Sequence, residues 1–159
     1  MIFVTVGTQL SFDRLVGTID EWAEARPEKP KIFAQTGKTS RRFVHLTNKP
    51  FLGHAEFQEK LTAADLVIAH AGMGSIISAL QVAKPILVMP RCAALGEHRN
   101  NHQMDTAERL AEMGYVNVAF DKHQLRIWLN NYRGITSLKT ISSTAQPILL
   151  DTIREFLDP

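Results

Sequence analysis

The chain has 159 residues, of which 45% are hydrophobic and 21% are charged, and its formal net charge at pH 7 is +2. This size and composition are typical of one globular domain with a substantial core, and so small a charge neither requires nor excludes a nucleic acid or an anionic membrane surface as partner. The single cysteine, Cys92, excludes an internal disulfide and favours a reducing compartment. The apolar runs are too short to span a membrane and the first residues lack the basic segment of a signal peptide, so we expect a cytoplasmic protein.

The first part of the chain predicts alternating strands and helices. Residues 2–6 and 31–35 are rich in apolar and β-branched residues and predict two strands. The helix between them is expected to begin at an N-cap, Ser11, because apolar residues recur at helical spacing from Leu15 onward. Residues 43–46 fit either a short strand or an irregular segment. A short extended piece and a helix are then predicted at residues 50–53 and 56–63.

The clearest pattern lies between residues 64 and 90. Leu66–Ala69 is an apolar run of strand length, and a glycine-containing turn at 70–75 follows it. Apolar residues then recur at helical spacing until Lys84-Pro85, where the proline ends the helix. Ile86–Met89 is a second buried run, so the segment reads as strand, turn, helix and strand. Such a βαβ unit implies a parallel sheet.

The remainder of the chain continues the alternation. Residues 91–101 predict a polar, flexible stretch, and a helix at 102–113 is expected to end at Gly114. The last predicted strand spans 115–119, and Asp121 is a predicted N-cap, with Gln124 in capping-box position. Residues 133–146 predict a loop and 147–157 a final amphipathic helix. We therefore predict one α/β domain over residues 1–159, a Rossmann-like fold with a parallel sheet and helices on both faces.

Three glycine turns follow three of the predicted strands: Gly7-Thr8, Thr36-Gly37-Lys38 and Gly72 to Ser75. The carboxyl ends of parallel strands share one edge of the sheet, and ligands bind beyond that edge. Free N–H groups at a helix N-terminus attract anions, so the third turn predicts a phosphate site, and we expect the diphosphate of a nucleotide-sugar there. The P-loop pattern is absent, and Ile77 stands where a dinucleotide fingerprint needs its third glycine.

Other polar residues leave alternatives open. His70 follows a strand beside the glycine turn and is either a structural hydrogen-bonding group or part of the site. His98 and His102 are four residues apart with Glu97 beside them, but the H-E-x-x-H order and a third ligand are missing, so no metal site is expected. Arg91 is expected to face solvent or phosphate.

At this point the sequence resembles a known family, the carboxyl-terminal, donor-binding half of GT-B glycosyltransferases of family 28. These enzymes transfer sugars from UDP-sugars to polyprenyl-diphosphate-linked acceptors. The likeness is greatest to stand-alone small subunits of two-part enzymes, from the dolichol-pathway N-acetylglucosaminyltransferase and from bacterial exopolysaccharide glycosyltransferases. It covers roughly residues 2–120. The matching pieces are Phe3–Thr8, Ser11–Asp13 with Leu15, Gln35–Gly37, Ala64–Ile68, His70–Gly72, Gly74–Ile76, Lys84-Pro85 and Asn101–Gln103.

The resemblance, with the three turns, implies a UDP-sugar donor site. Its residues would be Gly7, Thr8, Gly37, Leu52, Gly72, Met73, Gly74, Ser75, Ser78, Asn101 and Gln103. The first and third turns would bind the diphosphate, Leu52 would meet the uracil through its backbone, and Asn101 and Gln103 would bind sugar hydroxyls. Ser78 departs from the family, which has a glutamate there that binds the ribose hydroxyls. No catalytic residue is assigned beyond His70 as a nominee, and the donor is the only small molecule expected, with no cofactor.

The resemblance also implies a partner. A GT-B site lies between two halves, so this chain would be the donor-binding subunit of an inverting transferase, active only with a membrane-anchored subunit that carries the acceptor half. The chain would then lie peripherally at the cytoplasmic face of the membrane, without a nucleic-acid partner, and a homodimer is possible when that subunit is absent. Two alternatives remain. One is a non-catalytic scaffold or regulatory module with weakened nucleotide binding through Ser78. The other is a different nucleotide-dependent Rossmann enzyme such as an oxidoreductase, which the missing glycine disfavours.

Overall fold

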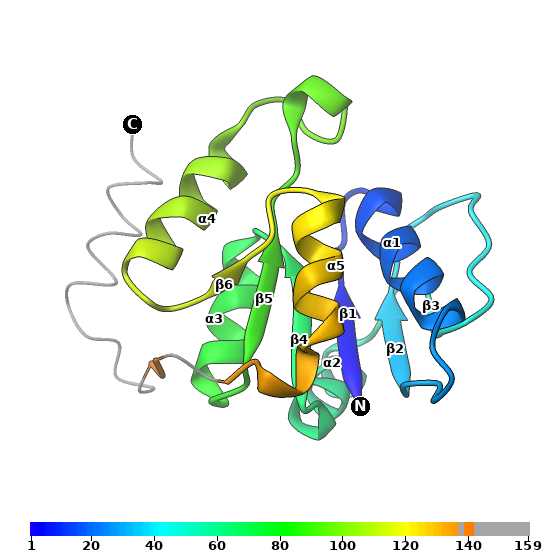
Figure 1. The fold of residues 1–159 in the computed structure, drawn as a ribbon. Coiled ribbons are helices and arrows are strands. Elements are labelled where there is room, and N and C mark those ends of the chain that lie inside the picture. The colour runs from blue at the N-terminus through cyan, green and yellow to red at the C-terminus, as the bar shows by residue number, and fades with distance from the viewer. Residues whose placement is uncertain (137–138, 142–159) are drawn as a thin grey trace.

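The computed structural model describes residues 1–136 and 139–141, which contain a six-stranded parallel sheet with helices on both faces (Figure 1). The strand order is β3-β2-β1-β4-β5-β6. The strands are β1 (Ile2–Thr5), β2 (Ile32–Gln35), β3 (Thr47–Lys49), β4 (Leu66–His70), β5 (Ile86–Met89) and β6 (Asn117–Val118). The helices are α1 (Asp13–Glu24), α2 (His54–Ala63), α3 (Met73–Gln81), α4 (His102–Glu112) and α5 (Lys122–Asn130), with short 3-10 turns η1 (Ala93–Leu95) and η2 (Tyr132–Gly134). The predicted helix at 147–157 lies outside the described residues.

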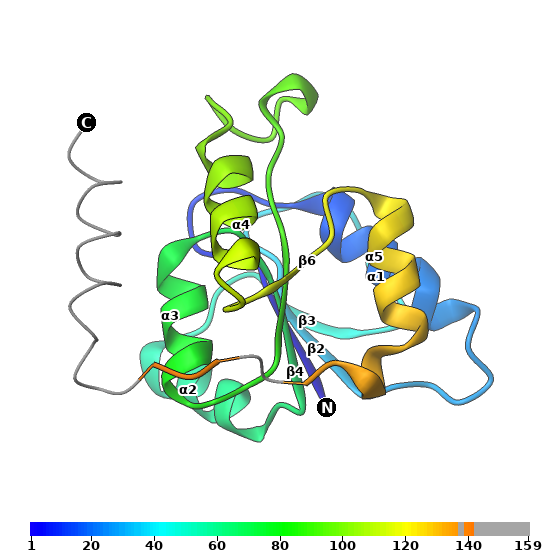
Figure 2. The ribbon, with the colours of Figure 1, turned by 60° about the vertical axis from the view of Figure 1, so that its left-hand side comes forward.

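Two hydrophobic layers enclose the sheet. Because side chains alternate along a strand, Ile2 and Val4 of β1 pack against α1 and α5, whereas Phe3 packs against α2 and α3. Figure 2 shows these two sets of helices on opposite sides of the sheet, with α4 on the side of α3. The central strands are covered on both faces, which explains why β4 and β5 read as unbroken apolar runs. Among the described residues, no helix is both long enough and apolar enough to cross a membrane.

Several predicted boundaries were wrong for physical reasons. Ser11 is not the N-cap of α1, because the helix begins at Asp13 and Phe12 takes the cap position without a side-chain hydrogen bond. The carbonyl of Ser11 instead accepts a hydrogen bond from Arg91, and Phe12 is buried in the core. Residues 43–46 take the irregular alternative, and the strand β3 follows them at Thr47–Lys49. Its three residues are all exposed, so it carries no apolar alternation that would reveal it.

The ends of two other elements also differ from the prediction. Helix α2 begins at His54, two residues early, because the extended Gly53 is its N-cap. Strand β6 has two residues where five were predicted, since it pairs with β5 only at Asn117 and Val118. The predicted caps at the other end of the chain are confirmed. Gly114 adopts a positive φ of 72° after α4, and Asp121 accepts a hydrogen bond from the N–H of Gln124 at the start of α5.

Candidate functional site

A cavity of about 550 Å3 lies at the carboxyl ends of the central strands. Nine of the residues singled out from the sequence line it: Gly7, Thr8, Leu52, His70, Gly72, Gly74, Ser75, Ser78 and Gln103. Gly37, Met73 and Asn101 are not among its lining residues. A larger hollow of about 690 Å3 lies beside the loop before β2, and none of the predicted site residues lines it. Most of the predicted residues therefore converge on one site although they are scattered widely along the chain.

The first and third glycine turns enclose the imidazole of His70. A Cβ atom on Gly72 would lie 2.1 Å from His70 Nε2, and one on Gly7 would lie 2.9 Å from His70 Cε1. Gly7 also has a φ of 77°, which favours glycine. The two glycines are thus needed for close approach to the ring. A Cβ on Gly74, by contrast, would meet no atom within 4 Å, because that residue faces the open cavity.

The N-terminus of α3 opens into the same cavity. Its N-cap, Gly72, has no side chain that caps the helix, and within the described residues the N–H groups of Met73 and Gly74 make no hydrogen bond. The hydroxyl of Ser75 lies on the same turn and also lines the cavity. Unpaired N–H groups and the positive end of the helix dipole form an anion site. This arrangement can hold a phosphate group without any cationic side chain.

His70 is largely buried at the end of β4. Burial, followed by the positive charge of Arg91, lowers the pKa of His70 from 6.5 to about 4. Its Nδ1 is buried near the Thr5 backbone but makes no hydrogen bond of good geometry. At pH 7 the ring is therefore neutral, and a base with so low a pKa removes protons poorly. The site favours His70 as a structural or ligand-contacting group over the catalytic role.

The lowered pKa makes the stability of the fold depend on pH. Below pH 6.5 the histidine of the unfolded chain binds a proton that the folded chain does not bind, so the free energy of unfolding falls as the pH drops toward 4. A folded pKa of about 4 predicts that this group alone makes the fold about 2 kcal/mol less stable at pH 5 than at pH 8. Urea unfolding at both pH values measures the loss. His70→Asn is expected to reduce it by that amount, and an unchanged loss would contradict the buried, neutral ring.

Ser78 lies on α3 at the edge of the cavity. Its hydroxyl donates a hydrogen bond to the carbonyl of Gly74 at 2.8 Å, one turn back in the helix. The single hydroxyl hydrogen is therefore used within the helix, and only the oxygen lone pairs are left to accept a hydrogen bond from a ligand. The most that Ser78 can offer a sugar hydroxyl is a single bond from a short side chain.

The residues predicted to bind the sugar hold a loop in place. Gln103 is buried and its Oε1 accepts the backbone N–H of Arg91 at 3.1 Å, while Asn101 Oδ1 accepts the N–H of Ala93 at 3.0 Å. Both amide groups thus pair with the segment that follows β5, and their Nε2 and Nδ2 atoms are the ends left for a ligand. The stretch at 91–101, predicted to be flexible, contains η1 and is fixed by several such bonds.

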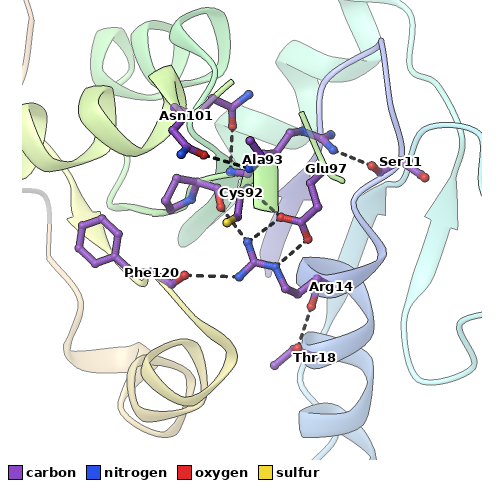
Figure 3. A network of polar contacts seen from close by, with 11 residues as sticks. Ser11, Arg14, Thr18, Cys92, Ala93, Glu97, Asn101 and Phe120 are labelled. Atoms are coloured by element: carbon purple, nitrogen blue, oxygen red, sulfur yellow. Dashed lines mark hydrogen bonds and ion pairs between the residues drawn. The ribbon is translucent and has the colours of Figure 1, made fainter. Parts of the chain in front are cut away.

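An ion pair between Arg14 and Glu97 braces the loops around the site (Figure 3). The guanidinium donates two bonds to the Glu97 carboxylate, at 2.7 and 2.8 Å, and further bonds to the carbonyls of Pro90 and Phe120. The same carboxylate accepts the N–H of Cys92 at 2.9 Å. Figure 3 shows Arg14, on α1, between the segment after β5 and Phe120 after β6. One side chain therefore joins the segments that follow three strands.

Arg91 adds a second brace. It was expected to face solvent or phosphate, but it is only 3% exposed. Its guanidinium donates to the carbonyls of Val6, Leu10 and Ser11, at 3.0, 2.8 and 2.6 Å. The turn that carries Gly7 and Thr8 is thus tied to the end of β5. A buried cation is tolerated here because backbone carbonyl oxygens accept the hydrogen bonds of its N–H groups.

The Arg14–Glu97 pair predicts a measurable effect on stability. Both side chains are nearly buried, with 12% and 14% of their surface exposed. Removing one member of a buried pair leaves the other uncompensated, so we expect Glu97→Ala to lower the free energy of unfolding by about 3 kcal/mol. Urea unfolding measures this. As control, Glu59→Ala removes an exposed pair with Lys60 and should have no measurable effect. Equal effects would show that the buried pair is no stronger than a surface pair.

Several lining residues were not identified as site residues from the sequence. Two of them, Thr5 and Gln35, are polar residues at the ends of apolar strands, and that break in the apolar pattern was a usable signal. His98 and His102 were considered only as metal ligands. Their rings pack edge to face with centroids 4.6 Å apart, and both Nδ1 atoms contact Asn100 Oδ1. The remaining lining residues are Val6, Gln9, Leu10, His54, Phe57, Gln58 and Arg91.

Comparison with known proteins places this chain in a family. The sequence pattern of the glycosyltransferase family 28 C-terminal domain matches residues 1–133. The chain belongs to this family. A relative in Saccharomyces cerevisiae, the UDP-N-acetylglucosamine transferase subunit ALG13, is 34% identical over 85 residues, which are 50% of this chain and 40% of that protein. The Mus musculus subunit of the same name is 39% identical over 128 residues, 72% of this chain and 10% of that protein. The chain thus matches less than half the length of these relatives.

Solved structures share the fold of this family 28 domain. The solution structure of ALG13 aligns with a TM-score of 0.64 at 19% identity and covers 96% of this chain and 93% of that one. MurG of Acinetobacter baumannii aligns with a TM-score of 0.60 at 18% identity and covers 83% of this chain and 41% of MurG. The expected fold class is therefore confirmed. The domain corresponds to less than half of the MurG chain.

Proposed function

We propose that this chain is the donor-binding subunit of an inverting, UDP-sugar-dependent glycosyltransferase. Its acceptor would be a polyprenyl-diphosphate-linked sugar or a polysaccharide. The observation that carries the proposal is the cavity at the carboxyl edge of the sheet, where two glycine turns meet the free N-terminus of α3. The names of the ALG13 relatives support UDP-N-acetylglucosamine as the first donor to test.

The charges around the cavity fit a diphosphate. Among the described residues that line it, none is an aspartate or glutamate, and the guanidinium of Arg91 supplies a permanent positive charge. The histidines His54, His70, His98 and His102 also line it, and the ring of His70 is neutral at pH 7. A lining without carboxylates does not repel phosphate and offers Mg2+ no carboxylate ligand. We therefore expect the donor to bind without a divalent cation, through backbone N–H groups and hydroxyls.

The chemistry that this half supplies is stabilisation of the leaving group. When the bond between the sugar and the diphosphate breaks, negative charge grows on the terminal phosphate oxygen. N–H groups at the start of α3, which the helix already holds in place, would stabilise this charge without rearranging. The neutral His70 does not supply a strong base, so the group that accepts the proton from the acceptor belongs to the partner.

The surface around the cavity supports a partner. Leu10, Phe51 and Leu95 are exposed, and they lie on the segments that follow β1, β3 and β5 at the same edge of the sheet. Large apolar side chains gathered at one edge mark an interface. We propose that the acceptor-binding subunit covers this edge and holds the chain at the cytoplasmic face of a membrane, and that a second copy takes its place when the subunit is absent.

The scaffold alternative rests on Ser78. Because its hydroxyl is bonded within the helix, nucleotide affinity is expected to be modest, and a chain that has lost it would be a regulatory module. A thermal-shift panel separates the alternatives. UDP should raise the melting temperature, with and without EDTA, whereas ADP, GDP and NAD should not. If none of the nucleotides raises the melting temperature, the scaffold alternative is favoured. If NAD alone raises it, an oxidoreductase is favoured.

A further inference from the structure

Gln35 is a polar side chain buried at the floor of the cavity. It is the last residue of β2, it is only 2% exposed, and it lines the cavity beside Thr5 and Gly7. Strand pairing places Thr5 and Gln35 directly opposite each other. Both lie two residues after a phenylalanine, Phe3 or Phe33, that packs on the side of α2 and α3, so their side chains share that face. Neither residue belongs to a glycine turn or to the pair of His98 and His102.

The hydrogen bonds of this pair involve the oxygen end of the amide. The N–H of Gly7 donates to Thr5 Oγ1 at 3.4 Å, and Thr5 Oγ1 donates its hydrogen to Gln35 Oε1 at 2.9 Å. The amide oxygen is therefore turned toward Thr5. Within the described residues Gln35 Nε2 makes no hydrogen bond. Ligand pockets place a few polar groups in their walls to orient the ligand, so an unpaired amide donor in this cavity wall indicates a ligand oxygen.

The surroundings of Gln35 indicate which part of a ligand it meets. The N–H groups of Thr36 and Gly37 donate to the carbonyls of Lys49 and Pro50, at 3.0 and 2.9 Å. The end of β2 therefore lies beside the segment that leads through Leu52 into α2. His98, by contrast, follows β5, with strands β1 and β4 between. If the diphosphate lies at the turn of α3, Gln35 lies on the Leu52 side of it.

We propose that Gln35 is a ligand-binding residue, whose Nε2 donates a hydrogen bond to an oxygen of the nucleoside half of the donor. Thr5 is the positioning residue that holds the amide in this orientation. This inference rests on the proposed function, because it takes the ligand to be a nucleoside diphosphate. It adds a direct contact between the nucleoside and a residue of β2 at the floor of the cavity.

Calorimetric titration of variants tests the proposal with three ligands: UDP, UMP and inorganic pyrophosphate. Gln35→Met keeps the length of the side chain and removes the donor. We expect it to weaken UDP and UMP binding to a similar extent, about tenfold, and to leave pyrophosphate binding unchanged. Thr5→Val should cause a smaller loss with the same ligand pattern. Gln81→Met, on the exposed end of α3, makes the same chemical change outside the cavity and should change nothing.

The outcomes separate this proposal from the general function. If the wild-type chain binds UDP and Gln35→Met binds it equally well, Gln35 does not contact the ligand. If the variant loses pyrophosphate binding to the same degree, its role is structural or at the phosphates, and the proposal is overturned. No nucleotide binding by the wild type would overturn both. Should Gln35→Met not fold, as judged by urea unfolding, Gln35→Leu also removes the donor without adding a charge and is expected to weaken UDP and UMP in the same way.

Discussion

Gly74→Val is expected to abolish nucleotide binding while the domain remains folded. Gly74 is the second residue of α3, beside the unpaired N–H groups that would receive the diphosphate. A Cβ there would meet no protein atom within 4 Å, so the added side chain extends into the cavity and displaces the ligand rather than the protein. Losing several hydrogen bonds to a charged diphosphate should cost at least about 100-fold in UDP affinity. Calorimetric titration measures the loss.

A matched variant controls for the substitution itself. Gly53 is the N-cap of α2, where an added Cβ would also meet open space and φ is −68°, but it does not line the cavity. Gly53→Val should therefore bind UDP like the wild type. Both variants should unfold cooperatively in urea, with free energies of unfolding within about 1 kcal/mol of the wild type. UDP affinity of Gly74→Val close to that of the wild type would contradict the placement of the diphosphate at α3.

Gly72→Ala is expected to have the opposite character, a large loss of stability. The new methyl group would lie 2.1 Å from His70 Nε2, closer than any van der Waals contact allows. The ring cannot simply retreat, because Gly7 approaches its Cε1 atom and the residue is largely buried. Overpacking of this kind lowers the free energy of unfolding by about 1–3 kcal/mol, and we expect the upper end of that range. Urea unfolding is the measurement.

A double variant assigns the cause. If the clash with His70 is responsible, Gly72→Ala combined with His70→Ala should be more stable than the sum of the two single losses predicts, by about 1 kcal/mol or more. Strictly additive losses would show that the methyl group disturbs something other than the ring. The comparison also tests whether the His70 ring is the reason that positions 7 and 72 require glycine.

How much of the fold is readable in the sequence depends on where each element gets its stability. The unit β4–α3–β5 is predictable because its signals are local: two apolar runs, a glycine turn and the Lys84-Pro85 stop. Strand β3 is not, because its three exposed residues pair only along the backbone with β2. The start of α1 is also not readable from Ser11. It is fixed by the burial of Phe12 and by a hydrogen bond from Arg91, which is far away along the chain.

The candidate site likewise contains some features that the sequence reveals and others that it does not. The glycine turns are recognisable in the sequence, because close backbone approach requires a residue without a Cβ. The braces are not, because Arg14 and Glu97 are 83 positions apart and nothing local distinguishes them from surface charges. Asn101 and Gln103 were assigned to the ligand, yet their oxygens pair with backbone N–H groups of the loop after β5. Side-chain pairing of this kind is settled only by the tertiary fold.

The most direct test of the donor site is calorimetric titration of the purified chain with UDP, with ADP and GDP as controls. We expect saturable binding of UDP that EDTA does not weaken, and much weaker binding of the two purine nucleotides. Failure to bind any nucleotide, or a preference for ADP or GDP, would contradict a uridine-nucleotide site in this cavity.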